Sequence, residues 1–68
     1  MIRLTSTRGS GKTPDGKRFE YSILELTGIG QSTREYQLDL QVDGQTGMFS
    51  DIVEKGKPID FAGEKWIF

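Results

Sequence analysis

One segment of the chain alternates apolar and polar residues almost without interruption. Within 34–44 the apolar side chains stand at every second position, with glutamine and aspartate between them: Tyr36, Leu38, Leu40 and Val42. A period of two directs all the apolar side chains to one face of a β-strand. The run ends on Asp43-Gly44, a dipeptide typical of tight hairpin turns. The segment therefore predicts a half-buried antiparallel strand over 34–42, but it does not indicate a function.

The length and composition limit how such a strand can be stabilised. The 68 residues correspond to one small β-rich domain, 1–68, near the lower size limit for a chain that folds alone. The chain has no cysteine and no histidine, which excludes disulfides and removes the usual zinc ligands and the usual general base. Stability must then come from tight packing or from association with another chain. We therefore predict no metal, no cofactor, and a protein partner or a homo-oligomer.

Charge is distributed unevenly along the chain, although the net charge is only −1. Residues 1–18 have a net charge of +4, residues 19–54 of −6, and residues 55–68 of +1. Either these parts complement each other within the fold or across a dimer, or the basic part binds an anionic partner. We favour the first interpretation, because nucleic-acid-binding domains usually have a larger basic excess.

The N-terminal half predicts two strands joined by a long connection. Alternation after Met1 predicts a strand over 1–7, and the glycines and proline that follow predict a long polar loop over 8–17. Segment 18–26 fits a strand that contains a bulge or is covered on both faces, and it also fits a helix ending at Gly28. Its aromatic and β-branched residues favour the strand. A glycine-containing loop is expected over 28–33.

The C-terminal half predicts shorter elements. If residues 45–49 pair back on the alternating strand, Asp43-Gly44 forms a two-residue hairpin turn. Segment 50–56 predicts a short helical turn, because Ser50 or Asp51 can accept its first N–H groups and Gly56 suits its end. A strand at 59–61, a turn at 62–63 and a last strand with Trp66 and Phe68 on one face are expected to complete the chain.

These elements together predict a mainly β fold. We expect a small antiparallel, barrel-like or curled sheet of five to six strands, with one short helical turn near 50–56. The order of the elements is compatible with both an SH3-like and an OB-like barrel. Closure into a barrel, or pairing with a second subunit, would remove the exposed edges of so small a sheet. Such an analogy of fold does not assign a function.

No arrangement of residues predicts catalysis. Gly11-Lys12-Thr13 resembles the end of a phosphate-binding P-loop, but Ser6 stands where that motif requires glycine and another turn begins at Pro14. Serine and threonine have no histidine to activate them, so only carboxylates remain for acid–base chemistry. Asp39, on the polar side of the alternating strand, is best interpreted as surface charge. We predict that the protein is not an enzyme and has no catalytic residue.

The predicted function is that of a small non-catalytic binding module that acts through protein–protein contacts. It would serve as a subunit, adaptor or inhibitor of a larger complex, and self-association is one form of this prediction. Three large apolar residues at the C-terminus cannot all face one side of a thin sheet, and aromatic residues are enriched in interfaces. The candidate interface residues are Met48, Phe49, Trp66 and Phe68.

The alternative is a small β-barrel that binds single-stranded nucleic acid through its basic segment 8–18. Its candidate residues are Arg8, Lys12, Lys17 and Arg18 for the phosphates, and Tyr21 and Tyr36 for stacking on bases. No apolar run approaches the length of a membrane span, and the N-terminus lacks the apolar core of a signal peptide. We therefore expect a cytoplasmic protein without a membrane partner.

Overall fold

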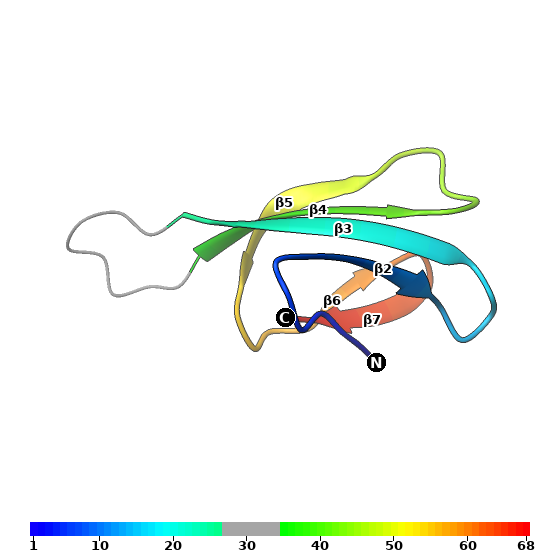
Figure 1. Cartoon of the computed structure of the whole chain (residues 1–68), viewed down its shortest axis with the longest axis horizontal. Coiled ribbons are helices and arrows are strands. Elements are labelled where there is room, and N and C mark those ends of the chain that lie inside the picture. The colour runs from blue at the N-terminus through cyan, green and yellow to red at the C-terminus, as the bar shows by residue number, and fades with distance from the viewer. Residues whose placement is uncertain (27–34) are drawn as a thin grey trace.

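The computed structural model describes residues 1–26 and 35–68, and within these ranges the chain is built from strands (Figure 1). In chain order they are β1 (Ile2–Arg3), β2 (Arg8–Lys12), β3 (Arg18–Glu25), β4 (Glu35–Val42), β5 (Phe49–Glu54), β6 (Ile59–Phe61) and β7 (Glu64–Ile67). They form one four-stranded sheet with the order β2-β3-β4-β5 and one three-stranded sheet with the order β1-β7-β6. The loop expected over 28–33, and Arg34, lie outside the described residues.

The alternating segment is β4, and its prediction as a half-buried strand is confirmed. β4 lies between β3 and β5 and pairs antiparallel with both. All four of its apolar side chains are buried in the core, and Leu40 has no exposed surface. The hairpin that follows is longer than the two-residue turn that we expected. β5 begins only at Phe49, which pairs with Leu40, so that the connection extends well beyond the turn at Gly44.

The segment over 18–26 is the strand β3, as predicted, and not a helix. Its pairing with β4 runs without a bulge from Phe19 opposite Val42 to Glu25 opposite Tyr36. The strand contains no bulge, and it is not covered on both faces, although we expected one or the other. Leu24 instead points to the outer face of the sheet and remains 64% exposed.

The helical turn predicted near 50–56 is wrong, because most of this segment is the strand β5. The adjacent β-branched residues Ile52 and Val53 favour an extended backbone, and a helix of two turns is marginal in water. Val53 also gains burial as the partner of Tyr36. The two residues expected to cap the turn have other roles. The Ser50 hydroxyl donates to the Asp39 carboxylate at 2.7 Å, and the Asp51 carboxylate accepts the N–H of Ile52 at 2.8 Å.

The long loop predicted over 8–17 is also wrong in its first half, where the chain forms the strand β2. Gly9 pairs with Tyr21 and Gly11 with Phe19, and the aromatic ring of each partner lies over its glycine. A Cβ atom at Gly11 would stand 2.9 Å from Phe19 Cζ, which is closer than side chains approach one another. The glycines are therefore required for packing, and they do not mark a flexible loop.

The second half of that segment is the tight turn between β2 and β3. The Gly16 N–H donates to the Thr13 carbonyl at 2.9 Å, and Gly16 itself has a φ of 86°. A three-residue connection of this kind, with a final residue in the left-handed region, is common in hairpins. The buried Thr13 hydroxyl donates to the Asp15 carboxylate and accepts the N–H of Lys17 at 3.1 Å. These contacts fix the register of β2 on β3.

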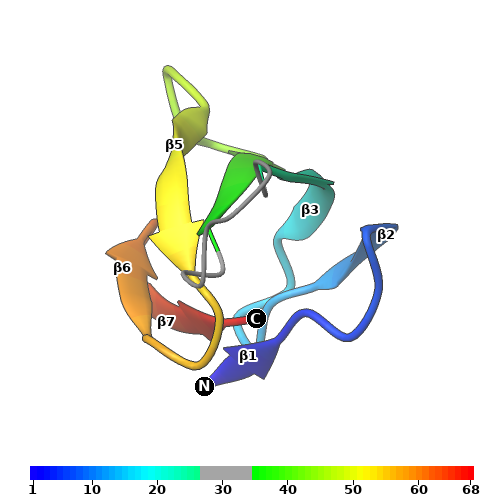
Figure 2. The same ribbon diagram turned by 90° about the vertical axis from the view of Figure 1, so that its left-hand side faces the viewer.

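The core lies between the two sheets, which face each other when the molecule is viewed from its end (Figure 2). Trp66 of β7 is its centre, with no exposed surface. The indole ring meets Phe19 edge to face at a centroid separation of 4.9 Å, and its N–H donates to the Phe61 carbonyl at 2.9 Å. The turn predicted at 62–63 joins β6 to β7 as expected.

The fold is mainly β, as predicted, but the sheets do not close into a barrel. In the described part of the chain, no strand pairing joins β5 to β6 or β1 to β2. The N-terminal strand predicted over 1–7 is only two residues long and pairs in parallel with β7, opposite to the antiparallel arrangement that we expected. So short a β1 does not reach β2, because Leu4 already turns into the core. β2 consequently stands at an open end of its sheet.

The packing of Phe19 on β2 predicts that Gly11→Ala destabilises the protein by about 1 kcal/mol. The added methyl group overpacks the contact with the ring, and this outweighs the entropy that alanine removes from the unfolded chain. Urea unfolding measures the effect. Gly47→Ala is the matched control, because nothing lies within 4 Å of a Cβ there, and it should be neutral or slightly stabilising. Equal stability of the two variants would contradict the packing argument.

The contacts in the turn between β2 and β3 predict the direction in which the pKa of Asp15 is shifted. The hydrogen bond from Thr13 is the largest influence and holds the pKa of the Asp15 carboxyl below its ordinary value, and Lys17 adds to this effect. The folded pKa is therefore lower than the unfolded one, so the stabilisation is present above the unfolded pKa and is lost as the pH falls through the folded pKa. An NMR titration of the carboxyl carbon should show the low pKa, and Thr13→Val should raise it toward the ordinary value.

Candidate functional site

The free edge of β2 presents backbone groups that no other strand of residues 1–26 and 35–68 uses. Ile23 N–H donates to the Thr7 carbonyl at 2.7 Å, and Thr13 N–H donates to the Lys17 carbonyl at 2.8 Å. In an antiparallel pair, alternate residues direct their N–H and C=O groups toward the same neighbour. Gly9 and Gly11 therefore bond to β3, and the residues between them turn their backbone groups away from it.

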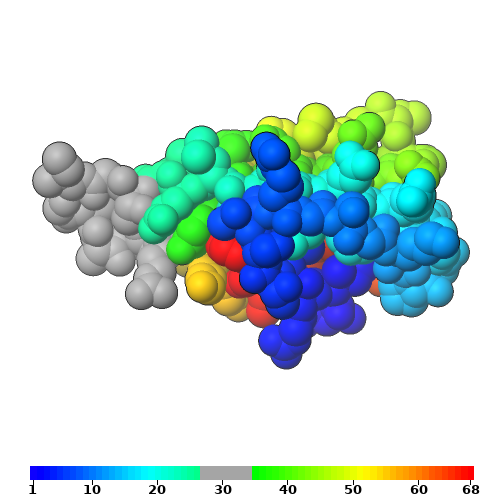
Figure 3. All heavy atoms as spheres, in the orientation of Figure 1, coloured from blue at the N-terminus to red at the C-terminus, as the bar shows by residue number. Residues whose placement is uncertain are grey.

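Those outward-facing groups belong to Arg8, Ser10 and Lys12. Among the described residues, β3 is the only strand hydrogen bonded to β2, and Figure 2 shows no strand beyond it on the open side. The Ser6 hydroxyl donates to the Arg8 carbonyl at 2.8 Å and so occupies one acceptor. Both backbone groups of Ser10 and of Lys12 remain for a bonding partner. In the space-filling view, the blue N-terminal segment that contains β2 forms part of the face turned to the viewer (Figure 3).

Cationic side chains flank this edge on the outer face of the sheet. Arg8 and Lys12 are exposed on β2, and Arg18 is exposed directly opposite Lys12 on β3. Two like charges in directly opposed positions destabilise a sheet. Within the described residues, no carboxylate forms a salt bridge with any of the three. Arg8 and Lys12 therefore place positive charge along the edge without a direct ion pair in the described residues.

A shallow groove of about 490 Å³ continues from this edge across the outer face. Side chains from β2, β3, β4 and the turn after β4 line it: Ser10, Lys12, Arg18, Glu20, Gln41 and Asp43. Its two cations and two carboxylates balance, so the groove as a whole does not select an anion. The positive charge is concentrated at its β2 margin. The second cavity, between the two sheets, measures only about 10 Å³ and is too small for a ligand.

The rest of the outer face combines a polar cluster with two exposed apolar side chains. Asp39 accepts from Ser50 at 2.7 Å, and the Gln37 amide donates to Ser50 at 3.1 Å. Leu24 and Ile52 are the neighbours of Gln37 on the two adjacent strands, and Ile52 is 53% exposed. The polar side of the alternating strand is thus an ordered surface in which Asp39 is hydrogen bonded to an alcohol and an amide.

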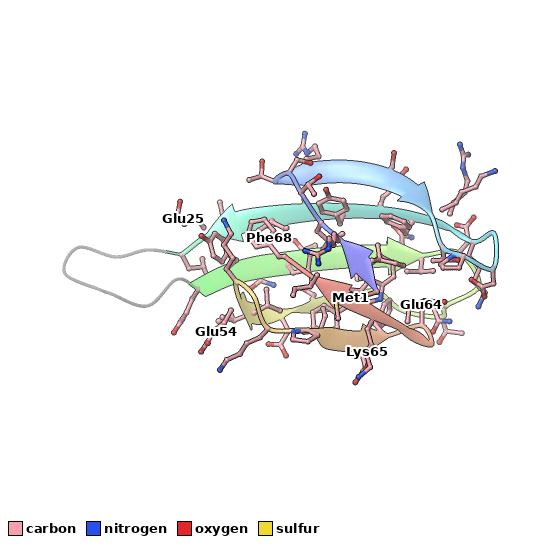
Figure 4. All side chains as sticks on the ribbon, turned by 90° about the horizontal axis from the view of Figure 1, so that it is seen from below. Met1, Glu25, Glu54, Glu64, Lys65 and Phe68 are labelled. Carbon is pink, nitrogen blue, oxygen red and sulfur yellow. The ribbon has the colours of Figure 1, made fainter. Side chains whose placement is uncertain are left out.

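The four candidate interface residues do not form one surface. Trp66 is fully buried, and Phe49 and Phe68 are partly buried by aromatic contacts with Phe61 and Tyr36 respectively. Only Met48 is largely exposed, at 53%. Figure 4 shows Phe68 toward the end of the molecule that carries Glu25 and Glu54. The two C-terminal aromatic side chains, Trp66 and Phe68, are thus accommodated mostly by the two-layered core.

The six residues of the nucleic-acid alternative also separate. Tyr21 and Tyr36 are buried, so neither ring presents a face on which a base could stack. Lys17 forms a salt bridge of 3.6 Å with Asp15 in the β2–β3 turn. Arg8 and Lys12 lie on the edge strand, and Arg18 lies opposite Lys12 on β3. The structure thus brings three of the predicted cations into one place without the predicted stacking residues.

No other kind of site emerges in the ranges 1–26 and 35–68. They contain no group of three or more carboxylates or other ligating side chains that could hold a metal ion. They also contain no helix with the length and apolarity needed to cross a bilayer. Comparison with known proteins found no matching family, no matching curated protein and no matching solved structure.

The open edge is the feature that the sequence reasoning missed. A signal for it was present, because Gly9 and Gly11 have the same spacing as Phe19 and Tyr21 on the far side of a Pro14-Asp15-Gly16 turn. Glycine facing an aromatic residue across a hairpin is a known way to stabilise an edge strand. The pairing of each glycine with an aromatic residue thus predicts an edge strand, although the glycines by themselves suggest a loop.

The opposed cations predict that Lys12→Glu stabilises the protein by about 0.5 kcal/mol. The substitution replaces a like-charge pair with an attractive one across β2 and β3, and the effect is small because both side chains are exposed. Urea unfolding at low salt should show the gain, and added salt should reduce it. Arg8→Glu, opposite Ser22, is the control and should change the stability less. Destabilisation by Lys12→Glu would contradict the repulsion.

Proposed function

We propose that this protein is a non-catalytic protein-binding module that captures an extended segment of another polypeptide as an additional strand beside β2. The observation that carries the proposal is the open edge, where Ser10 and Lys12 keep their outward N–H and C=O groups without a partner strand in the described part of the chain. An extended peptide that adds to such an edge gains backbone hydrogen bonds, and side chains on alternate positions provide its selectivity.

The rigidity of β2 supports this mode of binding. The Phe19 and Tyr21 rings hold the strand from one side, and the Thr13-centred turn fixes its end. An edge that is already extended and ordered does not have to lose conformational entropy when a partner binds. The strand therefore acts as a preformed template.

Removal of one backbone group, the N–H of Ser10, tests the proposal. Ser10→Pro removes the outward N–H at the middle of the edge without removing a bond to β3, and proline is tolerated on a strand edge that faces solvent. Peptides selected by display against the wild-type protein should lose at least tenfold in affinity for Ser10→Pro, as measured by calorimetry. Ser10→Ala keeps the N–H and should bind as the wild type does.

A second modification keeps the test valid if Ser10→Pro fails to fold. The chain is short enough for chemical synthesis, so an N-methyl group can be placed on Ser10 without changing its side chain. Amide signals of β3 and β4 report whether the fold is retained. Unchanged peptide affinity in a folded N-methyl protein would overturn strand addition at β2.

A further inference from the structure

We infer that the segment bound at β2 has an acidic outer face and an apolar inner face, with its two acidic residues four positions apart. This inference rests on the proposed strand addition and specifies its ligand. Ser10 would exchange both backbone hydrogen bonds with one central ligand residue. Residues two positions to either side of that residue would then lie opposite Arg8 and Lys12.

The outer positions follow from charge. Arg8 and Lys12 point to the outer face, as does Arg18 behind Lys12, and none of them forms a salt bridge in the described residues. A carboxylate opposite Lys12 would relieve the repulsion between Lys12 and Arg18, and a second carboxylate would face Arg8. Each directly opposed pair of unlike charges across a sheet favours binding.

The central position follows from Glu20. This exposed carboxylate lies next to Ser10 on β3, on the same face. A third acidic residue opposite Ser10 would be only two strands away from it, at a separation of about 10 Å. An uncharged residue such as threonine therefore suits the centre.

The inner positions follow from the two glycines. The ligand residues on either side of the centre would lie opposite Gly9 and Gly11, which have no side chains to obstruct them. The rings of Tyr21 and Phe19 lie over these glycines. Apolar ligand side chains would cover the ring edges and bury apolar surface. The recognised pattern is acidic, apolar, neutral, apolar, acidic.

Three peptides test this pattern. The probe is a capped peptide with Glu-Val-Thr-Val-Glu at its centre. One control, Val-Glu-Thr-Glu-Val, has the same composition but carries its charges on the opposite face. The other, Lys-Val-Thr-Val-Lys, keeps the apolar positions and reverses the charge. NMR titrations of the full-length protein at low salt give the affinities and the amide signals that shift.

Charge-reversal variants provide the matched test on the protein. Lys12→Glu and Arg8→Glu should each weaken binding of the glutamate peptide by about fivefold, the change expected for one cross-strand charge pair. Both variants should improve binding of the lysine peptide. Lys65→Glu, at an exposed position on β7, should leave both affinities unchanged.

The outcomes separate this inference from the proposed function. Preference for the glutamate peptide over both controls, lost in Ser10→Pro, supports the inference. Equal binding of the glutamate and lysine peptides, still lost in Ser10→Pro, overturns the acidic pattern and leaves strand addition intact. Equal binding of the two glutamate peptides, or displacement of the probe by short single-stranded DNA, shows unspecific attraction of anions and overturns the inference. A second copy of the protein could also occupy β2 with its own β5 edge. Concentration-dependent dimerisation in sedimentation experiments, in competition with the peptide, would reveal this and would also overturn the inference.

Discussion

The contact between Trp66 and Phe19 determines how the two sheets are joined. Strand pairing within the described residues stays inside each sheet, so it is mainly the core side chains that hold one layer against the other. One backbone hydrogen bond, from the Gly56 N–H to the Phe68 carbonyl at 2.7 Å, also joins the segments that follow β5 and β7. Trp66 supplies the largest of these side chains and has no exposed surface. Because Phe19 meets the indole on one side and covers Gly11 on the other, the same ring links β7 to the core and β2 to its sheet. The open edge is therefore held by the central packing of the molecule.

Much of this arrangement could be predicted from the sequence. The strict alternation in β4 predicts its buried face and its antiparallel pairing, and the turn residues at 62–63 predict the connection between β6 and β7. These predictions succeed because they depend on side-chain periodicity and on local backbone preference. The complete burial of Trp66 does not follow from side-chain periodicity or local backbone preference, because it depends on the packing of a second sheet against the first.

The two wrong elements have a common physical origin. Gly9 and Gly11 suggest a loop, and Ser50 and Asp51 suggest a helix start, when each segment is considered alone. Tertiary partners override these local preferences, because aromatic rings from β3 cover the glycines and β4 supplies a ladder for β5. The candidate site was predicted only in part for the same reason. The sequence indicates the cations, but only the pairing of β2 with β3 shows that two of them lie on a free backbone edge and that Arg18 lies beside Lys12 on the next strand.

The positive charge of the β2 edge has a further consequence for the protein at high concentration. If the β2 strands of two copies paired with each other in antiparallel orientation, Arg8 of one copy would lie near Lys12 of the other. Like charges in opposed positions disfavour that pairing, and charged residues on edge strands are a common protection against aggregation. If β2 adds an acidic strand as we propose, the same side chains would distinguish that foreign strand from an identical neighbour. An unpaired edge can then persist without seeding the growth of a continuous sheet.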